Sequence, residues 1–337
     1  MYRSKIVGLG KYVPENIVTN DDLTKFMDTS DEWIRERTGI EERRWVEEGD
    51  GNTTATMAHK ASLQALDRAG LKPDDIDFIV FATLSPDFYF PGSGVLLQDL
   101  LGVKNIGALD VRNQCSGFVY ATAVADQFIR TGMYKTVLVV GAEVQSTGID
   151  KSTRGRAVSV IFGDGAGAMI LTRSEDKNKG FLAHNLHSQG KYAPELWVEN
   201  PGSRTPTSKL MERLKENPED TSYYPYMNGN YVFKHAIVRF QEAILEALNT
   251  AGLTKEDLHL FIPHQANLRI SQFVQKQLGL KDEQVFNNIQ KYGNTTAASI
   301  PIALTEAWEQ GKIKEGDVIV QAAFGSGFTW GANLYRW

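Results

Sequence analysis

Short apolar runs alternate with longer amphipathic stretches along most of the chain. Three of these runs, at residues 78–83, 136–140 and 317–320, predict buried strands. Apolar positions three and four residues apart predict helices over residues 54–69 and 232–248. This alternation is typical of an α/β protein, and it predicts strands that run largely parallel.

Two segments of the chain recur in the same order about 180 residues further on. Ala69-Gly70-Leu71, followed by an acidic turn and an apolar run, has its counterpart in Ala251-Gly252-Leu253 with the same continuation. Leu101-Gly102-Val103-Lys104 has its counterpart in Leu278-Gly279-Leu280-Lys281. Each Ala-Gly-Leu reads as a helix end with a glycine cap. Such turns are common, but two matches in order predict a duplication, and hence two related α/β halves.

The predicted halves cover residues 1–175 and 231–337, and residues 176–230 connect them. Within the connection, residues 188–228 are rich in Pro, Gly, Asn, Ser, Tyr and charge, with a predicted short helix at 208–215. A loop of this length in a compact protein is usually a lid, a binding insertion or a linker. Its aromatic residues Trp197, Tyr223 and Tyr224 argue against a plain flexible linker.

The composition narrows the class of protein. Of 337 residues, 42% are hydrophobic and 23% charged, and the net charge of −5 is spread without long runs. This charge does not indicate a nucleic acid or an anionic membrane as partner. A membrane-spanning helix needs about 18 consecutive apolar residues, and the sequence contains no such run. The single cysteine excludes an intrachain disulfide and fits a reducing compartment, so we expect a soluble cytoplasmic protein.

That cysteine, Cys115, lies between a strand-like run and a helix-like run that covers residues 119–130. At such a junction, backbone N–H groups and the helix dipole favour a thiolate. An isolated cysteine is nevertheless more often a buried structural residue. A catalytic interpretation therefore depends on partners elsewhere in the chain.

Two candidate partners lie in the second half. His264 directly follows the predicted strand at 258–262, and sites in open α/β sheets gather at the carboxyl ends of strands. Asn294 opens an amphipathic helix that runs to about residue 310. The asparagine can cap that helix, or it can donate a side-chain N–H to a developing negative oxygen. An imidazole and an amide together would stabilise an enolate.

Two glycine-rich stretches, at residues 162–168 and 324–328, border strand-like residues. Neither matches a phosphate-binding loop or the Rossmann fingerprint. They predict tight turns with close backbone approach, and the second could offer a main-chain N–H to an oxyanion. No spacing typical of metal ligands is present.

Four motifs carry a resemblance to a known family. In order they are Cys115-Ser116-Gly117-Phe118, Pro263-His264-Gln265-Ala266-Asn267, Gly293-Asn294-Thr295 with Ala298-Ser299-Ile300-Pro301, and Gly327-Phe328-Thr329-Trp330-Gly331. The chain resembles β-ketoacyl-acyl-carrier-protein synthase III, a family of thiolase-fold condensing enzymes, nearly end to end. The resemblance implies a five-layer αβαβα architecture made of two duplicated halves, a homodimer, and no metal or permanently bound cofactor.

The resemblance also implies a reaction. Cys115 would take an acyl group from acyl-CoA, with the backbone N–H groups of Cys115 and Ser326 as the oxyanion hole. His264 and Asn294 would hold the thioester of a malonyl-acyl carrier protein while it loses CO2. The carbanion would then attack the acyl-cysteine, which is the decarboxylative Claisen condensation that initiates fatty-acid synthesis.

The same resemblance assigns binding roles. The implied CoA contacts are Trp33, Arg37, Arg156 and Asn267. The implied acyl pocket includes Phe90, Phe162 and Phe324, with Phe90 shaping the pocket of the partner subunit. Lys234 and Arg269 would dock the acidic carrier protein, and residues 176–230 would lie near the acyl-CoA entrance. Without the resemblance, each surface arginine or lysine would be interpreted as a solvated charge.

Three departures from the family pattern leave alternatives open. Asn113-Gln114 stands where small residues are usual, Ser326 replaces a glycine, and the segment at 188–228 is longer than in the common enzymes. One alternative is a condensing enzyme of a secondary pathway, of alkylquinolone or long-chain ketone type, with another acyl thioester. The other is an inactive subunit that binds CoA or carrier, against which the intact Cys115, His264 and Asn294 argue.

Overall fold

The computed structural model describes residues 2–337 and contains two main β-sheets. The first sheet has the strand order β1-β7-β6-β4-β5, with β1 (Arg3–Tyr12), β4 (Phe78–Ala82), β5 (Gly107–Val111), β6 (Thr136–Glu143) and β7 (Gly165–Ser174). The second has the order β11-β12-β13-β8, with β8 (Gly180–Ser188), β11 (Leu260–Pro263), β12 (Val318–Gly325) and β13 (Thr329–Arg336). Two small ribbons pair β2 (Ile17–Thr19) with β3 (Glu42–Arg44), and β9 (Leu196–Trp197) with β10 (Tyr226–Met227).

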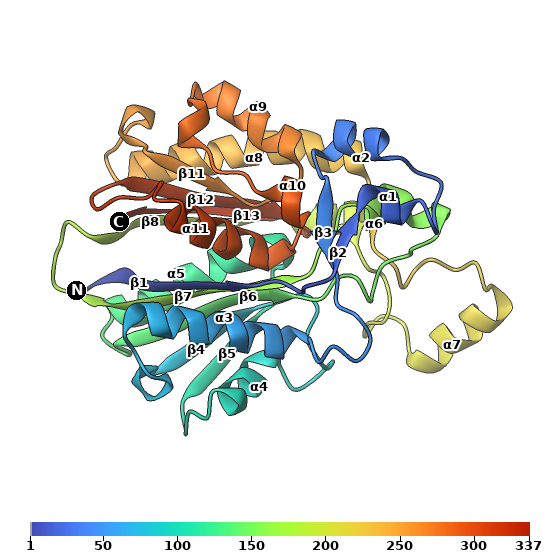
Figure 1. Ribbon diagram of the computed structural model, residues 1–337, viewed down its shortest axis with the longest axis horizontal. Coiled ribbons are helices and arrows are strands. Elements are labelled where there is room, and N and C mark those ends of the chain that lie inside the picture. The colour runs from blue at the N-terminus through green and yellow to red at the C-terminus, as the bar shows by residue number, and fades with distance from the viewer. Residues whose placement is uncertain (1) are drawn as a thin grey trace.

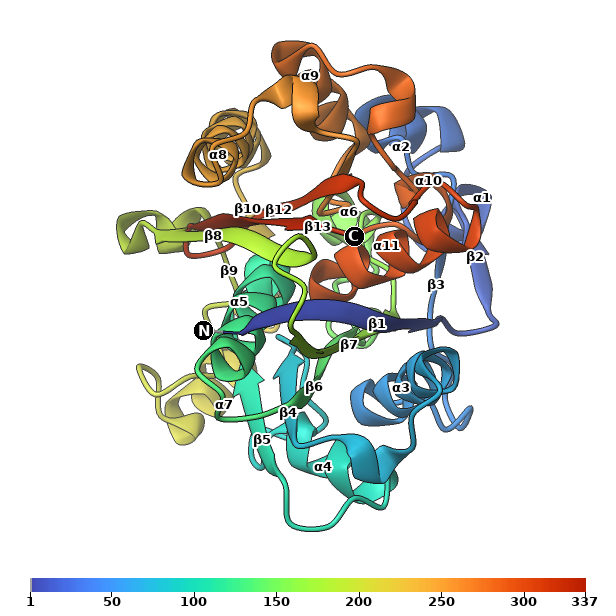
Figure 2. The same cartoon turned by 90° about the vertical axis from the view of Figure 1, so that its left-hand side faces the viewer.

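Helices form three layers around these sheets (Figures 1 and 2). The outer face of the first sheet carries α3 (Thr54–Ala69) and α4 (Ser93–Leu100), and that of the second carries α8 (Gly229–Thr250) and α9 (Leu268–Leu278). Between the sheets lie α5 (Gly117–Arg130) and α11 (Ser299–Glu309). The five-layer αβαβα prediction is therefore confirmed. None of the described helices has the length and apolar composition that crossing a membrane requires.

The other helices are short and lie around these layers. The α-helices among them are α1 (Asn20–Leu23), α2 (Asp31–Thr38), α6 (Arg156–Ser159), α7 (Thr207–Glu216) and α10 (Ile289–Tyr292). The 3-10 helices are η1 (Pro73–Asp75), η2 (Gln114–Ser116), η3 (Thr153–Gly155), η4 (Gly190–Glu195), η5 (Lys255–Asp257), η6 (Asp282–Gln284) and η7 (Thr296–Ala298).

The strand directions correct one prediction, because both sheets are mixed and not largely parallel. β4 runs parallel to β5 and β6, and β11 runs parallel to β12. The strands β7 and β13, however, run antiparallel to both of their neighbours. Only residues 326–328 join β12 to β13, and a parallel pair needs a much longer crossover connection.

The duplication predicted from the sequence is visible in the backbone. α3 leads through Gly70 (φ 66°) and η1 into β4, and α8 leads through Gly252 (φ 67°) and η5 into β11. The repeat extends to two residues outside the sequence match. Gln114 (φ 45°) and Thr296 (φ 46°) both adopt the left-handed conformation, which is uncommon for residues other than glycine, just before the two central helices.

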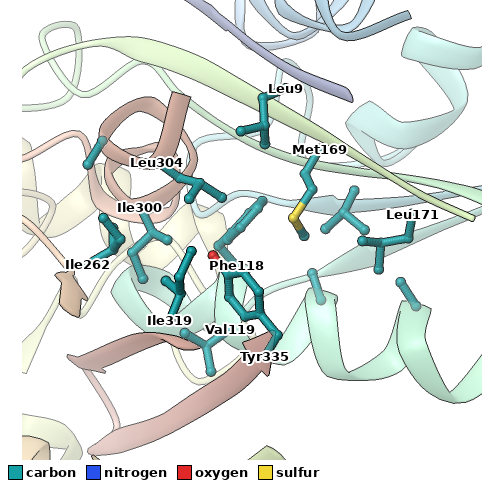
Figure 3. Close-up of a cluster of buried hydrophobic side chains, with 14 of the residues drawn as sticks. Leu9, Phe118, Val119, Met169, Leu171, Ile262, Ile300, Leu304, Ile319 and Tyr335 are labelled. Atoms are coloured by element: carbon teal, nitrogen blue, oxygen red, sulfur yellow. The ribbon is translucent and has the colours of Figure 1, made fainter. Parts of the chain in front are cut away.

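The central helical layer joins the two halves into one core (Figure 3). Phe118 of α5 and Leu304 of α11 are buried together with residues from both sheets, which include Met169 of β7 and Ile319 of β12. Because α5 and α11 are packed on both sides, their positions are tightly determined. The turns that precede these two helices therefore meet in the interior of the molecule.

The connection between the halves is shorter than the sequence suggests. Gly180–Ser188 forms β8, which pairs with β13 as an edge strand of the second sheet. The irregular part begins at residue 189 and carries α7, which covers the predicted helix at 208–215 and projects from the body of the protein (Figure 1).

Candidate active site

A cavity of about 960 Å³ brings the three principal candidates together. Cys115 comes from the junction of β5 and α5, His264 follows the end of β11, and Asn294 lies between α10 and η7. All three side chains line the cavity. The turns before the central helices thus place residues from both halves at one site.

Cys115 lies in η2, directly before α5, and is 8% exposed. The hydroxyl of Ser116 lies 2.9 Å from the carbonyl oxygen of Asn113 and 2.7 Å from the hydroxyl of Thr329. Thr329 in turn donates a hydrogen bond to the carbonyl oxygen of Ser326 at 3.0 Å. These contacts hold the turn that carries the thiol against the turn between β12 and β13.

The thiol of Cys115 is protonated in the resting protein. Burial raises its pKa to about 12, and the nearby carboxylate of Glu143 adds to the rise. The thiolate expected from the helix junction is therefore wrong for the resting state, because loss of hydration outweighs the favourable helix dipole.

Glu143, at the end of β6, is a functional candidate that the sequence reasoning missed. Its buried carboxylate accepts hydrogen bonds from the hydroxyl of Thr83, from the backbone N–H groups of Leu84 and Ser85, and from the N–H of Ala297. Burial raises the pKa of this carboxyl, and the hydrogen bonds oppose that rise. Glu143 ties the end of β4 to η7. Its signal in the sequence is a lone acid at the end of an apolar strand.

Gly325 allows the turn after β12 to approach Cys115 closely. A Cβ added at Gly325 would lie 2.9 Å from the Cβ of Cys115 and 3.1 Å from its backbone nitrogen. Any larger residue would therefore push the following Ser326 away from the thiol. In residues 2–337, no backbone carbonyl oxygen accepts a hydrogen bond from the N–H of Cys115 or of Ser326. Both groups are thus available to an oxygen atom.

His264 is 3% exposed, and burial lowers its pKa to about 3, so its imidazole is neutral at physiological pH. Its backbone N–H donates to the carbonyl oxygen of Ala322 at 2.8 Å. Its Nδ1 lies 2.7 Å from the hydroxyl of Ser299, while its buried Nε2 has no hydrogen-bond partner within the described chain. One imidazole nitrogen is thus anchored and the other is available to a ligand in the cavity.

The side-chain oxygen of Asn294 is engaged in a local turn, which leaves its amide group available. Its Oδ1 accepts a hydrogen bond from the backbone N–H of Thr296 at 2.8 Å. Its backbone pairs with that of Ile161 and Gly163 at 2.8 and 3.1 Å. Because the side-chain oxygen is committed, the orientation of the amide is set, and its NH2 group is the free donor. The predicted cap is wrong, because Ala298 precedes α11 and no side chain caps that helix, but the donor that the sequence suggested is free.

Comparisons with known proteins agree with this geometry. The sequence-family model of 3-oxoacyl-[acyl-carrier-protein (ACP)] synthase III matches residues 109–190, and the family model of its C-terminal part matches residues 248–337. The β-ketoacyl-[acyl-carrier-protein] synthase III of Caldanaerobacter subterraneus is 45% identical over 98% of this chain and 97% of the relative.

The chain belongs to the 3-oxoacyl-[acyl-carrier-protein] synthase III family.

Solved structures of synthase III enzymes have the same fold. The crystal structure from Aquifex aeolicus is 44% identical with a TM-score of 0.88, and covers 99% of this chain and 100% of that chain. The structure from Thermus thermophilus is 40% identical with a TM-score of 0.90, and covers 99% of both chains.

The four residues that the synthase III resemblance assigns to CoA gather beside the cavity. The guanidinium groups of Arg37 and Arg156 lie 4.5 and 4.9 Å from the centre of the Trp33 ring. Asn267 caps α9, and its side-chain amide donates to the carbonyl oxygen of Arg37 at 2.9 Å, which joins α2 to α9. Trp33, Arg37 and Asn267 line the cavity, and Arg156 donates to the carbonyl oxygen of Asp28.

The remaining predicted residues fall into two groups. Lys234 of α8 and Arg269 of α9 are both exposed, and the Arg269 guanidinium lies 5.7 Å from the centre of the Phe233 ring. Phe162 and Phe324 line the cavity, as does Arg269. Phe90 is 81% exposed and is not part of the lining of its own cavity. In residues 2–337, no group of three or more His, Cys, Asp or Glu side chains is arranged to hold a metal ion.

The long connection forms one wall of the cavity. Trp197, Asn200 and Tyr223 are among its lining residues. The hydroxyl of Ser326 donates a hydrogen bond to the carbonyl oxygen of Leu196, at the start of this wall. Ser326 thus anchors the connecting segment to the turn that follows β12.

We expect Gly325→Ala to destabilise the protein by about 1–3 kcal/mol, because the new methyl group collides with Cys115. Urea unfolding followed by circular dichroism measures the change. Gly190→Ala is the matched control, because a Cβ there meets nothing within 4 Å. Equal unfolding midpoints for the two variants would contradict the close contact.

Alkylation of Cys115 by iodoacetamide should accelerate about tenfold per pH unit between about pH 7 and 9, without a plateau. The reason is that the thiolate fraction rises tenfold per unit while the pH stays below a raised pKa. The single cysteine makes the label specific. Glu143→Gln removes a negative charge, so it should raise the rate at each pH. A plateau near neutral pH would show that the thiol is not held protonated.

Proposed function

We propose that this protein is an acyltransferase that initiates fatty-acid synthesis. It condenses an acyl-CoA primer with malonyl-acyl-carrier protein and releases CO2, free CoA and a 3-oxoacyl-acyl-carrier protein. The observation that supports this most directly is the one cavity that joins the thiol of Cys115 to the unpartnered Nε2 of His264 and to the side-chain amide of Asn294. Relatives that are 45% identical over almost the whole chain are named β-ketoacyl-[acyl-carrier-protein] synthase III, which favours this reaction over a secondary pathway.

The first step transfers the acyl group to Cys115. The sulfur attacks the carbonyl carbon of the acyl-CoA, and the N–H groups of Cys115 and Ser326 stabilise the negative oxygen that forms. The carbon–sulfur bond to CoA then breaks. CoA leaves as the thiol, so that the proton of Cys115 ends on the CoA sulfur. The covalent acyl-cysteine divides the condensation into two easier steps, and no bound cofactor takes part.

The second step forms the new carbon–carbon bond. His264 Nε2 and Asn294 Nδ2 donate hydrogen bonds to the thioester oxygen of the malonyl group while its C–CO2 bond breaks. The resulting carbanion attacks the acyl-cysteine, and the sulfur of Cys115 departs as a thiolate and takes a proton from solvent. A neutral imidazole suits this role, because it donates a hydrogen bond without adding a buried charge.

Substrate binding follows from the residues beside the cavity. Trp33 offers a flat ring to the adenine of CoA, and Arg37, Arg156 and Asn267 offer donors to the rest of the nucleotide. Lys234 and Arg269 present positive charge near the cavity to an acidic carrier protein, which favours docking through complementary charge. We place the activity in the cytoplasm, which the single cysteine also favours.

A homodimer is supported by the edge of the first sheet. β5 is the last strand in its sheet and has no further strand beside it in the described chain. Apolar side chains are exposed on and near it, including Leu109, Val95 and Leu100, together with Tyr89 and Phe90. An unpaired edge with such a surface is suited to pairing with a second copy of the chain. Phe90 of one subunit would then reach the acyl pocket of its partner.

Leu109→Asp is expected to convert the dimer into a monomer, because it would bury a carboxylate in each subunit where the two edge strands pair. Sedimentation or light scattering gives the mass, which should be that of two chains before the change and of one chain after it. Leu63→Asp is the control, since Leu63 is equally exposed on α3 but far from this edge. A wild-type protein with the mass of one chain would contradict the dimer.

Acylation and condensation can be tested separately. Incubation with acetyl-CoA or a branched short-chain acyl-CoA should add the acyl mass to Cys115, and addition of malonyl carrier should release a 3-oxoacyl carrier. Both His264→Ala and Asn294→Ala should acylate normally but condense more slowly, since each lost donor costs about 2.7–4 kcal/mol of transition-state stabilisation.

The outcomes that contradict this function are distinct. Absence of an adduct on Cys115 with every member of a panel of acyl-CoA thioesters would contradict the proposed reaction. A strong preference for long-chain or aromatic donors would indicate the secondary-pathway alternative. Loss of acylation in both the His264 and Asn294 variants would contradict their assigned roles. Unchanged pathway flux with Cys115→Ser would indicate an inactive binding subunit.

A further inference from the structure

Ser299 is a buried residue in direct contact with His264 that has no role in the mechanism so far. It is the first residue of α11 and is 2% exposed. Its hydroxyl oxygen lies 2.7 Å from Nδ1 of His264 and accepts a hydrogen bond from the backbone N–H of Gln265 at 3.3 Å.

The hydrogen bonds around this hydroxyl decide which nitrogen of His264 carries the proton. The oxygen already accepts the N–H of Gln265, and the hydroxyl hydrogen needs an acceptor of its own. In the described chain, Nδ1 of His264 is the acceptor within reach. If Nδ1 instead carried a hydrogen and donated it, the hydroxyl hydrogen of Ser299 would be buried without a partner, at a cost of about 1–3 kcal/mol. Ser299 is therefore the donor and Nδ1 is the acceptor.

We propose that Ser299 is a positioning residue that holds His264 in the tautomer with its hydrogen on Nε2. This inference rests on the proposed function, since it assigns the Nε2–H to the malonyl thioester oxygen. A neutral imidazole whose Nδ1 is occupied by a donor has its only hydrogen on Nε2. Nε2 is the atom that is buried, without a protein partner and in a residue that lines the cavity.

The same segment of chain orients both donors of the site. Thr296 in η7 occupies Oδ1 of Asn294, and Ser299 at the start of α11 occupies Nδ1 of His264. Each contact engages the acceptor atom of a side chain and leaves its N–H group free for the cavity. His264 is then a hydrogen-bond donor and not a base toward Cys115, because Nε2 has no lone pair to receive the thiol proton.

Nitrogen NMR tests the tautomer in the wild-type protein without any core substitution. The protein is labelled with 15N-histidine, and the signal of His264 is assigned from its absence in His264→Ala. We expect the pattern of an imidazole protonated at Nε2 alone at neutral pH. A signal from the tautomer protonated at Nδ1, or from an imidazolium, would overturn the proposal. This result does not depend on whether any acyl-CoA is a substrate.

The kinetic test uses Ser299→Ala with Ser62→Ala as the control. Ser62 is also a buried helix serine, but its hydroxyl donates only to the carbonyl oxygen of Ala58. Ser299→Ala should slow condensation by about 10- to 100-fold, the range typical when a partner that orients a functional histidine is removed. Acylation of Cys115 should stay within about threefold of wild type, and the 15N signal of His264 should show a mixture of tautomers.

Two results separate this role from a loss of packing. Ser299→Thr retains the hydroxyl and should recover the Nε2–H signal and most of the condensation rate. If Ser299→Ala slows acylation and condensation equally, or leaves the His264 tautomer unchanged, then Ser299 is not a positioning residue. Absence of acylation in the wild-type protein would instead count against the proposed function, and the NMR result would still decide the tautomer.

Discussion

The burial of α5 and α11 between the two sheets is the constraint on which the site depends. Neither half contains the site alone, because the thiol comes from the first half and the two donors come from the second. Packing on both faces of the central layer leaves these helices little freedom to shift. Their N-terminal turns are consequently brought together inside the protein, and the candidate site lies where two duplicated segments meet.

Burial also determines the electrostatic character of the site. It raises the pKa of Cys115 and lowers that of His264, so both groups are neutral in the resting protein. A neutral, poorly hydrated site is costly for a resting thiolate, but it strengthens hydrogen bonds to a charge that develops during reaction. In the proposed mechanism, reactivity therefore depends on donors aimed at the substrate oxygens and not on a preformed ion pair. The fixed orientations of His264 and Asn294 matter because water is too scarce in this site to replace a misplaced hydrogen-bond donor.

Much of the fold could be predicted from the sequence where a periodic pattern is long. The helix expected at residues 54–69 is α3 with the same limits, and the repeated Ala-Gly-Leu turns correctly indicated two halves. Strand direction could not be predicted, because a buried apolar run reads alike in parallel and antiparallel sheets. Motif order predicted Cys115, His264 and Asn294 as a set. The roles of Glu143 and Ser299 could not be found in this way, since a single acid or serine has no pattern until hydrogen bonds show what it contacts.

The duplication places different residues at equivalent positions of the two halves. Cys115 is the middle residue of η2, and Ala297 is the middle residue of η7. Glu143 ends β6, and Gly325 ends β12. Each strand end meets the turn of the opposite half: the carboxylate of Glu143 accepts the N–H of Ala297, whereas Gly325 lies against Cys115. At the first contact, the side chain of Glu143 fills the space and accepts the backbone N–H of Ala297. At the second, glycine lets the backbone pack directly against Cys115, whose N–H is bonded to no backbone carbonyl of the described chain. The equivalent contact is thus a closed hydrogen bond in one half, and in the other it adjoins the position that the proposed mechanism gives to the oxyanion.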